Sequence, residues 1–167
     1  MKAIPVENLV FTFDSSTVAQ KYDDWRHPMT GKAVDIVAVH PSTTTWLIEA
    51  KDFRVISKPP KPSNNRQLPE TMAQKVTDTL VGLADAAFHA SDPSEKLHAI
   101  LATSTPHKRV VLHLEPYTGR VHSYLFPVNF SANVHQKLRQ LISHIDPNPL
   151  VLNIANTPRA GVPWSVK

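Results

Sequence analysis

The chain has 167 residues, no cysteine and a formal net charge of +4. Its length fits one domain over 1–167, and the absence of cysteine excludes disulfides and thiolate metal sites. No run approaches the roughly 18 apolar residues of a membrane span, and no signal-peptide core follows Met1, so we expect a cytoplasmic protein without a membrane partner. The basic balance fits a polyanion such as nucleic acid.

The first half of the chain contains a short strand, a helix and a hairpin, in that order. Weak alternation over 7–13 predicts the strand, and a serine cap at 15 or 16 begins a helix with apolar positions at 18, 22 and 25. Strand-like runs over 32–39 and 45–53 flank a turn at 40–44, which predicts a hairpin.

The second half alternates helices and strands. A long helix begins at Pro69, and a second follows the capping sequence at Asp92. The runs 109–114 and 120–126 predict a further hairpin. A helix after Ser131 and a buried strand over 150–154 complete the chain. This order predicts an α/β fold around a mixed central sheet.

The first hairpin brings charged residues together. Glu49 and Lys51 are two apart on one strand, so they share a face. A turn centred on Ser42 places Asp35 directly opposite Glu49. Two close carboxylates among apolar neighbours repel each other unless a proton or a cation lies between them, and a hard cation suits them. The alternative is a plain ion pair of Lys51 with either acid at a strand end.

The pattern Asp35…Glu49-Ala50-Lys51 on a hairpin between helices resembles the PD-(D/E)XK nuclease superfamily. The resemblance covers about 15–90, and Val34 stands where the superfamily name has proline. It implies a restriction-endonuclease-like α/β/α sandwich, similar to that of Holliday-junction resolvases, around a mixed central β-sheet.

The resemblance also implies residue roles for a divalent-metal-dependent nuclease. Asp35, Glu49 and the Ala50 carbonyl would bind Mg²⁺ or Mn²⁺, and Lys51 would orient the attacking water. The expected helix offers no glutamate as an extra ligand, so Glu7 is the preferred candidate, and Asp14 is expected to act as a structural cap. Gln74 faces the active site or else solvent.

Nucleic acid is the expected partner, DNA more than RNA. A set of basic residues could contact phosphates, or simply be solvated: Arg54, Lys58, Lys61, Arg66 and Lys75. The chain contains no motif for sequence-specific recognition of nucleic acid, so a homodimer or a partner subunit would supply specificity. The rival hypotheses are a catalytically inactive subunit that binds nucleic acid or scaffolds a repair or defence complex, and a purely structural interaction module.

Overall fold

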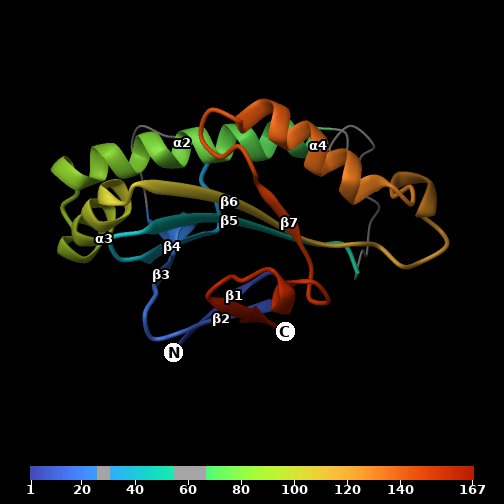
Figure 1. Cartoon of the computed structure of the whole chain (residues 1–167), viewed down its shortest axis with the longest axis horizontal. Coiled ribbons are helices and arrows are strands. Elements are labelled where there is room, and N and C mark those ends of the chain that lie inside the picture. Colours follow the sequence, from blue (N-terminus) through green and yellow to red (C-terminus); the bar gives the residue numbers. More distant parts are fainter. Residues whose placement is uncertain (26–30, 55–66) are drawn as a thin grey trace.

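A computed structural model of the chain describes residues 1–25, 31–54 and 67–167. A five-stranded sheet in the order β3-β4-β5-β6-β7 runs through its middle (Figure 1). Its strands are β3 (Val18–Lys21), β4 (Ile36–His40), β5 (Thr44–Asp52), β6 (His107–Glu115) and β7 (Leu150–Leu152). The first three pair antiparallel and β5, β6 and β7 pair parallel, so the predicted mixed sheet is confirmed.

Helices cover one face of this sheet (Figure 1). The α-helices of the described ranges are α2 (Leu68–His89), α3 (Pro93–Ser104) and α4 (Phe130–Ile142). The buried positions of α2 recur every three or four residues, as a helix with one apolar face requires. Asp92 caps α3 by accepting a hydrogen bond from the Ser94 N–H. No helix within these ranges is long and apolar enough to cross a membrane.

A second, three-stranded sheet covers the other face. It consists of β1 (Lys2–Val6), β2 (Leu9–Phe13) and β8 (Trp164–Val166), with β2 in the centre. Its apolar residues pack on Ile36 and Ile48 of the central sheet. The α/β class is therefore confirmed, but the described residues form helix, sheet and sheet layers and contain no second helical layer as an α/β/α sandwich requires.

Two predicted elements are wrong. The helix expected after residue 15 is strand β3 followed by the 3-10 helix η1 (Tyr22–Asp24), because residues 18–21 pair along β4. The second hairpin is absent from the described residues, because β6 pairs with β5 on one side and β7 on the other. The segment expected as its return strand contains the 3-10 helix η2 (Ser123–Leu125). A further 3-10 helix, η3 (Thr157–Arg159), precedes β8.

Candidate functional site

The β4–β5 hairpin has the predicted register. Ile36 pairs with Ile48, so the next pair brings Asp35 opposite Glu49. Both side chains are nearly inaccessible, with 8% of Asp35 and 1% of Glu49 exposed. The Ala50 N–H donates a 2.8 Å hydrogen bond to Asp35 Oδ2, which fixes one carboxylate oxygen. The sheet therefore holds two carboxylates side by side where solvent has little access.

The segment before β4 is fixed from both sides. The Tyr22 N–H donates to the Asp35 carbonyl at 2.8 Å. The Val34 N–H donates to Thr79 Oγ1 of α2 at 3.0 Å, inside the core. Backbone groups buried in this way need such partners, and here the partners set where Asp35 lies.

Two lysines neutralise the acids. Lys51 Nζ lies 3.0 Å from Glu49 Oε1. Lys75, on α2, places its Nζ 2.7 Å and 2.9 Å from the two Glu49 oxygens and 3.9 Å from Asp35 Oδ1. The ion pair that the sequence offered as an alternative is thus present, and a second lysine adds to it.

The electrostatics of this cluster follow from burial and proximity. Burial raises the pKa of Asp35, and repulsion from Glu49 raises it further. Burial disfavours the charged form of Lys51, but the carboxylates around it outweigh burial and raise its pKa. Lys51 therefore stays protonated at neutral pH and serves as a fixed positive charge.

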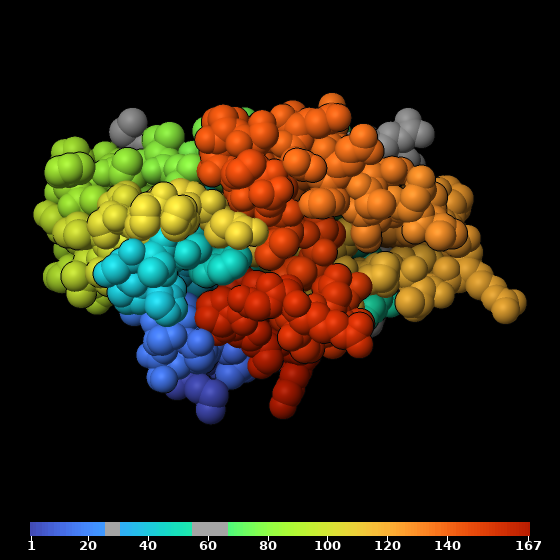
Figure 2. Space-filling view, viewed as in Figure 1, coloured from blue at the N-terminus to red at the C-terminus, as the bar shows by residue number. Residues whose placement is uncertain are grey.

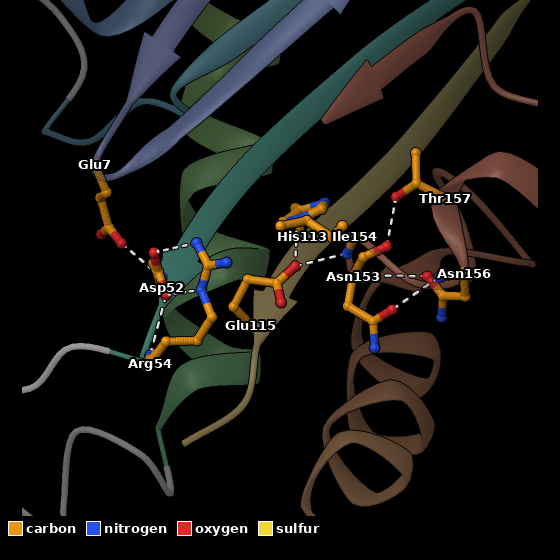
Figure 3. A network of polar contacts seen from close by, with 9 residues as sticks. All are labelled: Glu7, Asp52, Arg54, His113, Glu115, Asn153, Ile154, Asn156 and Thr157. Atoms are coloured by element: carbon orange, nitrogen blue, oxygen red, sulfur yellow. Dashed lines mark hydrogen bonds and ion pairs between the residues drawn. The ribbon is translucent and has the colours of Figure 1, made fainter. Parts of the chain in front are cut away.

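Glu7 closes the outer side of the cluster. It sits in the β1–β2 turn at a φ of 53°, where non-glycine residues are uncommon. Its Oε1 lies 3.4 Å from Lys51 Nζ, and its Oε2 accepts a 2.6 Å hydrogen bond from the Asp52 N–H. Beside it, Arg54 donates from Nε and Nη2 to the two Asp52 oxygens at 2.9 Å and 2.8 Å, as Figure 3 shows.

A buried histidine–glutamate pair lies on the opposite face of the sheet. His113 Nε2 is 2.8 Å from Glu115 Oε1, which also accepts a 2.6 Å bond from the Ile154 N–H (Figure 3). Burial lowers the pKa of His113. Sequence reasoning missed this pair, although the spacing of two along one strand was a usable signal.

The other predicted site residues have mixed outcomes. Gln74 is exposed and donates to Asp78 Oδ1 at 2.7 Å, so the structure does not bring it to the cluster. Its neighbour Lys75 occupies that place. Lys58, Lys61 and Arg66 lie outside the described residues.

The next question is whether the acids of this cluster can bind the predicted divalent metal ion. No group of three or more His, Cys, Asp and Glu side chains suited to a metal ion is found in the described ranges. Asp35 and Glu49 supply two carboxylates, to which the prediction adds the Ala50 carbonyl. The Lys75 ammonium already contacts both oxygens of Glu49, so a cation must compete with it. The residues fit a divalent ion only when Lys75 moves.

Comparisons with known proteins give one informative likeness. The chain is 29% identical over 210 aligned positions to a cysteine–tRNA ligase of Neisseria meningitidis serogroup A, serotype 4A. The alignment covers 99% of this chain but 30% of the ligase, so the chain spans less than a third of its relative. No family model and no solved structure matches.

This likeness overturns the predicted activity. A relative named as a tRNA ligase conflicts with a metal-dependent nuclease, so the predicted hydrolysis of phosphodiester bonds is wrong. The nuclease activity was expected because paired carboxylates often hold a catalytic metal. In the structure the same carboxylates form ion pairs with lysines. The preference for DNA and the homodimer gain no support from the comparison and stay predictions.

Proposed function

We propose that this chain binds tRNA and serves as a recognition unit in tRNA charging. The observation that carries the proposal is the alignment of nearly the whole chain with part of a cysteine–tRNA ligase. The net charge of +4 supports it, because a basic unit is attracted to RNA phosphates. The partner is therefore RNA in preference to DNA.

The proposal is limited to recognition because of what the chain shares with its relative. The matched segment is 30% of the ligase, which leaves most of that enzyme without a counterpart here. The chain has four glycines and no glycine-rich phosphate loop, so its sequence has no such cradle for a nucleotide triphosphate. Binding fits these residues better than amino-acid activation.

We propose the basic residues of the segment 51–66, here called the basic segment, as the phosphate contact. Glu49 engages both Lys51 and Lys75, and Asp52 engages Arg54, so these three cations are partly neutralised. The remaining basic residues predicted here, Lys58, Lys61 and Arg66, follow in the sequence. Their charge is the part of the basic segment to test first.

The fold relationship and the cation are also proposals. The hairpin Asp35…Glu49-Ala50-Lys51 beside a parallel strand supports a relationship to the PD-(D/E)XK superfamily in the central sheet, with a small sheet in place of the second helical layer and without cleavage. Asp35, Glu49 and the Ala50 carbonyl would hold Mg²⁺ or Mn²⁺, which would supply positive charge for a nearby phosphate. A calorimetric Mn²⁺ titration tests this, because Asp35→Asn should abolish binding and Lys75→Met should strengthen it by removing a competing ammonium. Binding unchanged in both variants would contradict the assignment.

The function is tested by fluorescence anisotropy with labelled tRNA, a duplex RNA and a duplex DNA of similar length, each at several salt concentrations. We expect tRNA to bind at least about tenfold more tightly than duplex DNA, a factor that corresponds to about 1.4 kcal/mol. Equal affinity for tRNA and DNA, or no affinity for tRNA, would overturn the proposal.

A double variant tests the basic segment separately. Lys58→Gln with Lys61→Gln should weaken tRNA binding and reduce the salt slope by about one for each lysine that touches a phosphate in the wild type. The matched control is Lys96→Gln with Lys137→Gln, which removes the same charge from α3 and α4. If both double variants weaken binding equally, the attraction comes from net charge alone and the basic segment is not where the RNA binds.

A further inference from the structure

Two hollows meet at Trp46, near the start of β5 and away from the acid–lysine cluster. One has a volume of about 400 Å³, and the other has a volume of about 430 Å³. Thr44 and Trp46 line both. The β4–β5 turn (cyan), the start of β6 (yellow) and the C-terminal segment (red) come together on the face shown in Figure 2.

The indole of Trp46 is held firmly and stays partly accessible. The Arg109 guanidinium lies 5.5 Å from its ring centroid, and Trp164 meets it edge to face at 5.2 Å. Trp46 is half-buried, in contrast to the buried Trp164. A fixed aromatic ring beside a guanidinium plane is a surface on which a nucleobase stacks.

The larger hollow is basic at its rim. Arg109 is oriented by Asp146, with Nε 3.2 Å from Oδ2, and by the Asn148 carbonyl, 3.0 Å from Nη2. Asp146 is itself buried and also accepts from the Val110 and Asn148 N–H groups, so its charge is well compensated. Lys108 Nζ, also at the rim, already donates to the Thr105 carbonyl and hydroxyl and to the Thr103 carbonyl. The guanidinium N–H donors that Arg109 does not use on Asp146 and Asn148 remain to receive a phosphate.

The smaller hollow is polar, and no lysine or arginine of the described residues lines it. Asp14 Oδ1 accepts from the Ser16 N–H and from the Ser16 and Thr17 hydroxyls, so its carboxylate stabilises a local turn before β3 and caps no helix. His40 Nδ1 pairs with Thr43 Oγ1 at 2.8 Å, which directs Nε2 elsewhere. These groups suit the hydroxyls and base edges of a nucleotide better than a second phosphate cluster.

We propose that the two hollows take two successive nucleotides of an unpaired RNA segment, with a base stacked at Trp46 and a phosphate at Arg109. Each volume suits a group of nucleotide size, and a recessed ring can be reached only by a base that is not already paired. The inference rests on the proposed RNA binding and assigns it a second contact. Trp46 and Glu49 lie on opposite faces of β5, so this contact is separate from the ion cluster.

Intrinsic fluorescence provides the test, because a stacked base quenches the indole. A short single-stranded oligoribonucleotide should quench the wild-type protein saturably. Trp46→Phe should lose most of that quench while keeping part of the affinity, and Trp46→Leu should weaken binding about tenfold or more. Trp25→Phe is the control that keeps the quench, because Trp25 packs against the core on the helical side of the sheet. Circular dichroism would establish that each variant is folded.

The outcomes separate this inference from the proposed function. If tRNA binds the wild type and Trp46→Leu equally well, and the oligoribonucleotide leaves fluorescence unchanged, the Trp46 site is wrong while tRNA binding stands. If the oligoribonucleotide binds and quenches while structured tRNA does not bind, the site stands and the function in tRNA charging falls. If neither RNA binds the wild type, both are overturned.

Discussion

Lys75 Nζ lies 2.7 Å from Glu49 Oε1, which joins the middle of α2 to the end of β5 through a charge pair that is mostly buried. Only 2% of the Glu49 side chain and 19% of the Lys75 side chain are exposed. Lys51 approaches the same carboxylate from the strand itself. A buried acid with two cations costs little only while both cations remain.

Removing Lys75 should therefore destabilise the protein. We expect Lys75→Met to lower the free energy of unfolding by about 1–3 kcal/mol, because Glu49 stays buried with one cation fewer. Urea denaturation measures this. The control is Lys137→Met, whose exposed partner Glu70 lies 3.9 Å away, and that change should cost less than about 0.5 kcal/mol. Equal costs for the two variants would show that the buried pair contributes nothing.

Asp35 should give the stability a distinctive pH dependence. Burial and then the Glu49 charge raise its pKa above the usual 3.8, so the folded state binds this proton more tightly than the unfolded chain. Ionisation of Asp35 therefore costs stability as pH rises from about 4 through the raised pKa, and protonation removes that cost below it. Relative to wild type, Asp35→Asn should gain stability over this rise.

The measurement for Asp35 is the difference in urea stability between the two proteins at several pH values from about 4 to 7. Most other titrating groups are common to both and cancel in the difference. Asparagine keeps an oxygen that can accept the Ala50 N–H, so the hydrogen bond is matched. A difference that stays constant with pH would show that Asp35 titrates normally.

The sequence predicted the hairpin well because its determinants are local. A short turn between two apolar runs sets the register, and the register alone brings Asp35 opposite Glu49. Lys75 was expected to contact phosphate or to be solvated, and its pairing with Glu49 was not predicted. That pairing depends on how α2 packs on the sheet, which helical periodicity does not determine to within one residue.

Long-range pairing explains the larger errors. β8 closes the small sheet by pairing Trp164 with Phe13, at the far end of the chain, and no neighbouring residue signals this. The parallel pairing of β6 likewise has no turn to announce it. Val18, Tyr22 and Trp25 matched helical spacing by chance, whereas pairing with β4 makes residues 18–21 a strand. Tertiary contacts outweighed the local pattern in each case.

The β4–β5 turn offers a stabilising substitution. Ser42 is exposed and has a φ of 66°, a conformation that disfavours residues with a Cβ. Ser42→Gly removes that strain but adds entropy to the unfolded chain, so we expect a net gain of a few tenths to about 1 kcal/mol. Thermal unfolding measures it, with Ser42→Ala as the control that should not gain. A loss of stability in the glycine variant would contradict the strain.

His98 should make the fold sensitive to acid. It is 2% exposed and packs against Trp25, and burial lowers its pKa from 6.5 to about 4. The neutral ring therefore contributes stability that is fully present above pH 6.5 and is lost as pH falls toward about 4, because the unfolded chain takes up the proton first. The loss over that window is about 3 kcal/mol.

His98→Leu should flatten this part of the pH profile of stability, whereas His89→Gln on the exposed end of α2 should leave it unchanged. Identical profiles for wild type and His98→Leu would mean that this histidine is not the group that titrates.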